Sequence, residues 1–368
     1  MMKMKSIITV AITAILVSAG CVREESTDFK LTVVPQAGIN AIDTSNLNEA
    51  VRIIKWRLIN FGISLENVNI ATSADRIDLK ISKIDTAETG IIENLIIMPG
   101  EIGFFETYEN GDIISFLSDA NTRLKEMNVI TDNVISDQPA ETRTEDTLSI
   151  DELALLDIME NDTTGDASMK RFKAENPLFG ILIPMVDNEG QPRPSCLIGI
   201  AALTDTAMVN KCLNMDEIKV LFPRDLRFYW SRDPYKWDDS KTLFELHAIK
   251  ETTYDGQAPL DGSVIASSKP VKAKSGDAMV NISMTSEGAK IWSRMTRDNI
   301  DRCIAVILDG YVISYPRVMA EITGGNTQIS SGFSLPEAKY LAAILSTGGD
   351  NLPLKLQIAD KQIIRHQP

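Results

Sequence analysis

The sequence predicts an α+β protein in which a βαββαβ base domain is interrupted by an inserted α+β head domain. Three observations lead to this prediction. Helical and strand-like apolar patterns alternate over residues 29–109, an acidic segment follows at residues 131–168, and folded patterns return over residues 169–350. A chain of 368 residues has room for two or three domains, and its apolar fraction of 44% is ordinary for globular proteins.

The base domain is predicted from four strands and two helices. Runs rich in Ile, Val and Leu predict strands at residues 29–34, 68–71, 77–81 and 102–108, and helical periodicity predicts helices at residues 44–62 and 86–98. This order is that of a ferredoxin-like fold, in which both helices cover one face of the sheet.

The first helix has the clearest pattern. Asn46 and Glu49 are suitable for capping its first turn, and Gly62 is suitable for ending it. One apolar face is formed by Leu47, Val51, Ile54, Leu58 and Phe61. This stripe predicts an amphipathic helix packed on the sheet.

A tight hairpin is predicted near the end of the head. Residues 304–308 and 311–315 are two apolar runs joined by Asp309-Gly310. A type I′ turn needs positive φ at both central residues, and Asp-Gly suits it. Asp309 is therefore interpreted as a turn residue rather than a catalytic one, because no His, Lys or second carboxylate lies beside it.

Two further features of this region have structural interpretations. Ser334 and Glu337 have capping-box spacing and open a predicted helix that Gly348-Gly349 ends. Gly324 and Gly325 follow a strand-like segment. They lack the Lys and Ser/Thr of a phosphate loop, so we expect them to satisfy backbone geometry.

Residues 131–168 have a different composition from the rest of the chain. They are rich in Asp, Glu, Ser and Thr, and Arg143 is their only Arg or Lys. Such a segment buries too little apolar surface to order itself. We expect disorder, with a partner-docking tail as the alternative.

Residues 284–356 resemble the end of the first extracytoplasmic domain of SecD, the export-assisting partner of the Sec translocon. The motifs are SEGA, AVILDGYVISYP and ITGGNTQISSGFSLPEA, in that order and at the spacing of the family. The segment IIKWRLINFGISLENVNIATSADRIDLKI also resembles SecD, as does the insertion at residues 175–250. The resemblance covers most of residues 29–356 and implies a base near the membrane and a mobile head that holds substrate chain.

The insertion contains a cluster of five aromatic residues: Phe228, Tyr229, Trp230, Tyr235 and Trp237. In a folded domain such residues usually belong to the core or pack under loops. The alternative is a surface that grips extended, apolar polypeptide.

The first residues predict secretion and lipid anchoring. Lys3 and Lys5 precede an apolar run at residues 7–17, which is too short to span a bilayer. Small residues then lead to Cys21, as in a lipobox. We expect Cys21 to carry lipid and to anchor the protein in the bacterial cell envelope, facing the periplasm or the exterior. An ordinary secretory signal peptide is the alternative.

Composition excludes several kinds of site. A net charge of −14 argues against nucleic acid as a partner. Cys196, Cys212 and Cys303 remain after Cys21, which leaves at least one free thiol and room for one disulfide. His247 and His366 are the only histidines, and no catalytic or cofactor motif is present. We therefore expect no cofactor, no metal and no enzymatic activity.

The expected function is that of a membrane-anchored, SecD-like accessory lipoprotein that binds exported polypeptide or Sec translocon components. A structural or regulatory envelope lipoprotein that kept the fold but lost the export role is the alternative, and an enzyme is the alternative from another class.

The sequence predicts the following division of the chain into domains: a signal peptide at 1–20, a lipidated tether at 21–28, the base at 29–109, the start of the head at 110–130, the acidic insertion at 131–168, the head at 169–350, and a return strand and tail at 351–368.

Overall fold

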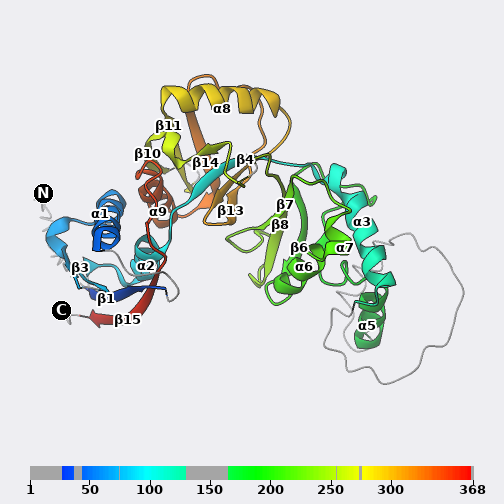
Figure 1. Ribbon diagram of the computed structural model, residues 1–368, viewed down its shortest axis with the longest axis horizontal. Coiled ribbons are helices and arrows are strands. Elements are labelled where there is room, and N and C mark those ends of the chain that lie inside the picture. The colour runs from blue at the N-terminus through cyan, green and yellow to red at the C-terminus, as the bar shows by residue number, and fades with distance from the viewer. Residues whose placement is uncertain are drawn as a thin grey trace, which may run out of the picture.

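In the computed structural model, the described residues are 27–36, 44–73, 75–129, 165–253, 255–272 and 276–365. They form three bodies arranged as an arch (Figure 1). We call them the terminal body (27–97 and 356–365), the central body (102–107 and 260–345) and the lateral body (108–250). Helices and several antiparallel sheets are mixed throughout, so the predicted α+β class is confirmed. The predicted signal peptide, Cys21 and the start of the tether lie outside the described residues.

The terminal body is one antiparallel sheet covered by two helices. Its elements are β1 (Thr27–Pro35), α1 (Thr44–Phe61), β2 (Val68–Thr72), β3 (Ile77–Ile84), α2 (Thr89–Ile97) and β15 (Leu356–Arg365), with short 3-10 turns at Leu65–Asn67 and Thr86–Glu88. The strand order is β15-β1-β3-β2. Alternate residues of β1 and β3 are buried against the helices, as period-two patterns require: Phe29, Leu31, Val33, Ile77, Leu79 and Ile81.

Two predictions for this body are wrong in detail. The strand predicted at residues 102–108 is not in this sheet. Instead β4 (Ile102–Glu106) pairs with β12 (Ile304–Leu308) and β9 (Leu260–Asp261), and β15 takes the expected place beside β1. Residues 102–105 are all buried, which suits an inner strand with two apolar faces. In addition, α1 already begins at Thr44, so Asn46 lies inside the first turn and is not its cap.

The central body contains two small sheets and two helices. Their orders are β10-β11-β14 and β13-β12-β4-β9. The elements are β9 (Leu260–Asp261), β10 (Ile265–Lys272), β11 (Ala278–Met284), α8 (Ser286–Asp298), β12 (Ile304–Leu308), β13 (Tyr311–Ser314), β14 (Asn326–Phe333) and α9 (Leu335–Leu345), with a 3-10 turn at Gly262–Val264. Ser334 and Glu337 form the predicted capping box of α9.

The lateral body is an insertion between β4 and β9 with its own sheet, ordered β5-β6-β8-β7. Its elements are α3 (Asn110–Glu126), α5 (Gly165–Glu175), β5 (Ile183–Pro184), β6 (Leu197–Ala202), α6 (Thr206–Leu213), α7 (Asp216–Lys219), β7 (Leu226–Trp230) and β8 (Leu243–Lys250). The chain enters and leaves side by side, because the Tyr108 N–H donates to Ala248 O at 3.0 Å. Of the predicted acidic insertion, residues 131–164 lie outside the described part, whereas 165–168 begin α5.

One hydrophobic core runs through the terminal and central bodies, and a second fills the lateral body. Arg57 lies fully buried at the crossing from α2 to β4. Its Nη1 donates to Leu95 O at 3.2 Å and Met98 O at 2.6 Å, and its Nη2 donates to Pro99 O at 2.6 Å. Burial lowers the pKa of Arg57 to about 10, so the guanidinium is still charged at neutral pH. Arg57 therefore holds the chain where it leaves the terminal body.

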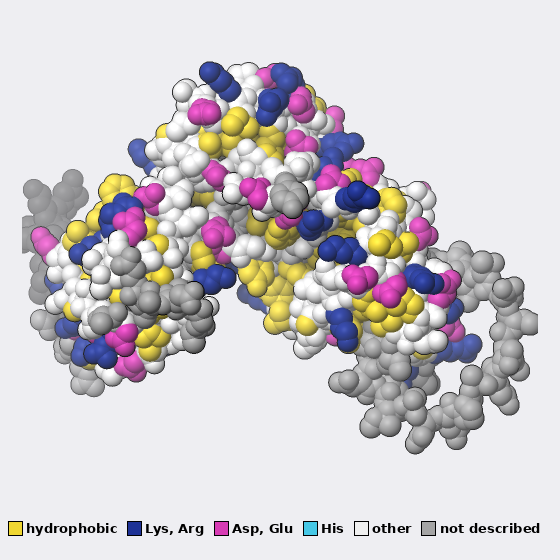
Figure 2. All heavy atoms as spheres, in the orientation of Figure 1, with side chains coloured by type: hydrophobic (Ala, Val, Ile, Leu, Met, Phe, Trp, Pro, Cys, Tyr) yellow, Lys and Arg dark blue, Asp and Glu magenta, His cyan; other side chains and the backbone are white. Residues whose placement is uncertain are grey.

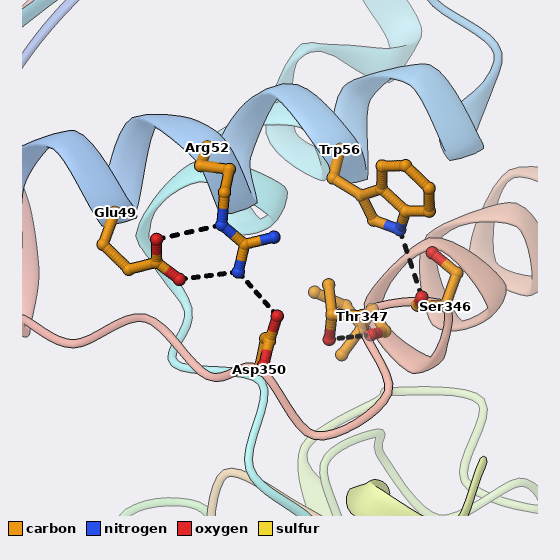
Figure 3. A network of polar contacts seen from close by, with 7 residues as sticks. Glu49, Arg52, Trp56, Ser346, Thr347 and Asp350 are labelled. Carbon is orange, nitrogen blue, oxygen red and sulfur yellow. Dashed lines mark hydrogen bonds and ion pairs between the residues drawn. The ribbon is translucent and has the colours of Figure 1, made fainter. Parts of the chain in front are cut away.

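Polar contacts also fasten α1 to the segment after α9 (Figure 3). Arg52 Nη2 lies 2.6 Å from Glu49 Oε1 and 2.6 Å from Asp350 Oδ2, and Trp56 Nε1 donates to Ser346 O at 3.1 Å. Arg52 and Asp350 are each 54% exposed, so their ion pair contributes little stability in water. The pair does join α1 to the segment that leads into β15.

Among the described residues, none of the helices combines the length and the apolar character that crossing a bilayer requires.

Candidate functional site

A cleft of about 580 Å³ opens where the three bodies meet, on the concave side of the arch. Figure 2 shows hydrophobic side chains gathered on this underside. Its lining comes from all three bodies: Ile91, Asn94, Met98, Leu203, Thr206, Asn210, Trp230, Ser231, Arg232, Asp233, Phe244, Leu308, Tyr311, Glu337 and Tyr340. No single domain of the sequence therefore contains the site.

One wall of the cleft combines the terminal and central bodies. Met98 follows the end of α2, Leu308 and Tyr311 flank the β12–β13 turn, and Tyr340 lies on α9. Tyr311 is 48% exposed, whereas Tyr340 is 7% exposed. Burial raises the pKa of Tyr340 to about 12, so its hydroxyl stays neutral at physiological pH. This wall presents apolar surface with the two tyrosine hydroxyls and the Glu337 carboxylate.

The opposite wall belongs to the lateral body. Trp230, at the end of β7, donates from Nε1 to Asn210 Oδ1 at 2.9 Å, which fixes the indole ring. Arg232 Nη2 lies 2.9 Å from Asp233 Oδ2, and its guanidinium carbon lies 6.0 Å from the Tyr340 ring centroid. The charge of Arg232 is therefore neutralised within the cleft.

Of the five aromatic residues considered for polypeptide binding, only Trp230 lines this cleft. Phe228 lies in a second groove, and Tyr229 packs on the opposite face of β7 against the central body. Tyr235 is half-buried after β7, and Trp237 is 76% exposed outside the cleft. The structure thus brings two of them to recessed surfaces on one side of β7 and separates the other three.

Sequence reasoning missed most of the cleft. Met98, Phe244, Tyr311 and Tyr340 lie on four distant segments, and none stands beside another in the sequence. Tyr340 lies inside α9, the helix predicted from the Ser334–Glu337 capping box, but no signal in the sequence placed its side chain in a cleft.

Asp309 and Gly310 form the β12–β13 turn, with φ of 51° and 84°. The Asp309 carboxylate has a second role that sequence reasoning missed. Its Oδ1 accepts hydrogen bonds from the N–H groups of Gly100 and Glu101, each at 2.8 Å. Its Oδ2 is buried and has no hydrogen-bond partner among the described residues, and burial raises the pKa of Asp309. Asp309 therefore fastens the α2–β4 crossing to the hairpin beside the cleft.

We expect Asp309→Asn to keep this turn, because Asn tolerates positive φ and its amide oxygen can accept the same two bonds. The folded protein holds the Asp309 proton more tightly than the unfolded chain does. Stability from this group is therefore present below about pH 4 and is lost as pH rises through the folded-state pKa. The Asn variant should gain stability relative to wild type over that interval, as measured by urea denaturation at a series of pH values.

Asp309→Ala is the contrasting variant. It removes both hydrogen bonds and leaves a residue that rarely adopts positive φ, so it should be less stable than Asp309→Asn by roughly 1–3 kcal/mol at every pH, because neither variant carries the titrating carboxyl. A difference between wild type and Asp309→Asn that does not change with pH would contradict the raised pKa.

Gly325 and Gly324 differ in their surroundings. Gly325 has a φ of 65°, and a Cβ there would lie 2.6 Å from the Ala289 Cβ of α8. Its carbonyl accepts from the Met284 N–H at 2.8 Å. Gly324 has open space around it. Gly325 therefore allows the start of β14 to approach α8 closely.

The three described cysteines are buried and free. Cys196 Sγ lies 3.7 Å from His247 Nδ1, and His247 Nε2 lies 3.3 Å from Glu245 Oε2. Burial and the neighbouring Cys303 thiol raise the pKa of Cys196, which keeps it protonated. Within the described part of the chain, no three His, Cys, Asp or Glu side chains are arranged to hold a metal ion. We interpret this cluster as packing between the lateral and central bodies.

Comparison with known proteins gives consistent results. Residues 242–352 match the family described as SecDF, P1 head subdomain. The protein translocase subunit SecD of Rhodothermus marinus is 25% identical over 354 residues, which are 94% of this chain and 50% of that protein. The SecD subunit of Acidaminococcus fermentans is 36% identical over 110 residues, which are 30% of this chain and 26% of that protein.

A crystal structure of SecDF in a super-membrane-facing form is similar with a TM-score of 0.44 and 17% identity, over 92% of this chain and 30% of that one. The chain spans half or less of the two SecD subunits described above. The chain is thus similar to a SecD subunit over most of its length, and its residues 242–352 match the SecDF P1 head subdomain.

Proposed function

We propose that this protein is a non-enzymatic accessory of protein export that holds exported or unfolded polypeptide in the cleft under the arch. The observation that carries the proposal is the lining of that cleft, which joins apolar and aromatic side chains from all three bodies. A surface that accepts many different chains depends on apolar contact rather than on one sequence. The matched relatives are named as translocase subunits, so Sec translocon components are the second class of partner in this proposal.

The proposed arrangement is a ferredoxin-like base carrying a head. The terminal body has the strand order of that fold, with β15 in the place of the last strand. The central and lateral bodies together form the head. The base therefore consists of the two ends of the described chain, and the crossings near Pro99 and Leu352 connect it to the head.

The proposed location is the extracytoplasmic side of the bacterial cell envelope, with the chain held there by lipid on Cys21. The N-terminal strand β1 begins at Thr27, a few residues after that cysteine. A lipid on Cys21 would keep the terminal body beside the membrane, with the head farther away. Nucleic acid is not a partner in this proposal, since the net charge is −14.

Titrating a fluorescent unfolded peptide onto the full chain in mild detergent tests the proposal. We expect weak binding that Trp230→Ala reduces on the order of tenfold, because truncating an aromatic anchor in a recessed site removes a large share of binding energy. Trp237→Ala is the matched control, since Trp237 is 76% exposed and lies outside the cleft. If both variants bind the peptide with the affinity of wild type, the peptide binds outside this cleft.

Crosslinking in intact cells separates the two binding functions. Nascent exported proteins among the crosslinked products would support the export function. One stable envelope protein, without exported chains, would instead favour a structural or regulatory lipoprotein.

A further inference from the structure

The strand β7 lies at one edge of the lateral sheet and pairs only with β8 inside that sheet. The direction of its backbone groups follows from the bonds at its two ends. The Ser231 N–H donates to Glu245 O at 2.8 Å, and the Glu251 N–H donates to Asp225 O at 2.8 Å. Odd-numbered residues of this segment therefore bond to β8, and even-numbered residues direct their backbone groups outward.

Phe228 is the even-numbered residue at the middle of β7. Its opposite residue, Ala248, donates its N–H to Cys196 O and accepts from the Tyr108 N–H, so Ala248 bonds away from β7. The Phe228 N–H and C=O consequently point to the free edge. In the described part of the chain, no turn, loop or side chain supplies a partner for either group.

The two ends of this edge are closed by the protein itself. At one end Leu226 O accepts from Arg227 Nη1 at 2.8 Å. At the other end the Arg232 N–H donates to Val312 O at 2.9 Å, where Ser231 bridges to β13. Capping of this kind is how proteins protect strand edges. The stretch around Phe228 is left open between the two caps.

Recessed surface lies along the same open edge. A second groove of about 620 Å³ runs between α6, α7 and β7, and it shares Asn210 with the cleft under the arch. Phe222 and Phe228 form its floor with ring centroids 5.2 Å apart, and Val220 is 77% exposed on its rim. The cleft and the groove together form a path beside β7, here called the apolar path, whose lining also includes the charged residues Asp216, Lys219, Arg224 and Arg227.

We propose that an extended segment of polypeptide adds to the free edge of β7 as a short extra strand, with its apolar side chains in the cleft and the α6–β7 groove. This inference rests on the proposed function and specifies the form in which the chain is bound. An unpaired N–H and C=O on one strand are complementary to the backbone of another strand, whatever its sequence. Apolar side chains on alternate positions of the bound segment would meet the apolar path.

A matched pair of variants tests the backbone contact. Phe228→Ala removes the ring and keeps the outward N–H, whereas Phe228→Pro removes both and spares the bonds to β8. The probe is a short fluorescent peptide of alternating valine and serine, titrated onto the full chain. We expect Phe228→Pro to bind this peptide roughly tenfold more weakly than Phe228→Ala does, because a buried N–H to carbonyl bond is lost.

The peptide supplies a second test that does not depend on the folding of a variant. Methylation of all its backbone nitrogens should strongly weaken binding to wild type, since the peptide then has no N–H to donate to Phe228 O and its methyl groups keep its backbone away from the edge of β7. If methylated and unmodified peptides bind equally, and the two Phe228 variants also bind equally, the added strand is wrong while polypeptide binding stands. If the unmodified peptide does not bind at all, the proposed function fails with it. A dimer in sedimentation experiments that Phe228→Pro dissociates and Phe228→Ala does not would assign the edge to a second copy of the chain, and would overturn the proposal.

Discussion

Arg57→Ala should be among the most destabilising single substitutions in this protein. The variant leaves the carbonyls of Leu95 and Met98 without the guanidinium that bonds them, whereas Pro99 O keeps its bond from the Leu352 N–H. Each buried acceptor without a partner costs about 1–3 kcal/mol, so a loss of about 3 kcal/mol or more is expected. Urea denaturation followed by circular dichroism measures it.

Arg52→Ala is the matched control, on the same helix and one turn away. Its partners Glu49 and Asp350 are near half exposed, so water replaces them at little cost and the unfolding midpoint should hardly change. Gly100→Ala should resemble Arg57→Ala, because Gly100 has a φ of 87° and an added Cβ would collide with the Arg57 guanidinium. An Arg57→Ala variant with the unfolding midpoint of wild type would mean that other contacts hold the α2–β4 crossing.

Cys21→Ser should release the protein from membranes. A lipid-modified cysteine holds a chain through its acyl groups, and serine cannot carry the thioether that attaches them. We expect the wild-type protein in the membrane pellet after a high-salt wash and the variant in the supernatant, as measured by immunoblot of the two fractions. Membrane retention of Cys21→Ser after that wash would contradict lipid anchoring, or would identify a tightly bound membrane partner.

Local patterns in the sequence predicted local structure well. The Ser334–Glu337 capping box, the helix that it opens and the strands on both sides of Asp309-Gly310 lie where periodicity and turn chemistry predict them. Each depends on residues within one turn or one hairpin, so the neighbouring sequence contains the information. Strand partners over long distances are different. Whether β4 or β15 joins β1 depends on packing that no local window contains.

The candidate site shows the same limit. Trp230 could be selected from its aromatic neighbours, but Tyr340 and Met98 reach the cleft only because the terminal and central bodies share a core. The turn at Asp309 was predictable, whereas its bonds to Gly100 and Glu101 were not, since these residues are far away in the sequence. Burial of its carboxylate depends on the same tertiary contact.

The pairing of β1 with β15 determines when the terminal body can finish folding. Thr27 pairs with Arg365, so all the residues between them must be synthesised before β1 acquires its second neighbour. Contacts between residues so far apart in the sequence require a large loop closure and form slowly. During synthesis, one edge of β1 is therefore unpaired until β15 has been made. An unpaired strand edge of this kind favours aggregation. A chain truncated before Leu356 would keep that hazard permanently, even with the lateral body fully folded.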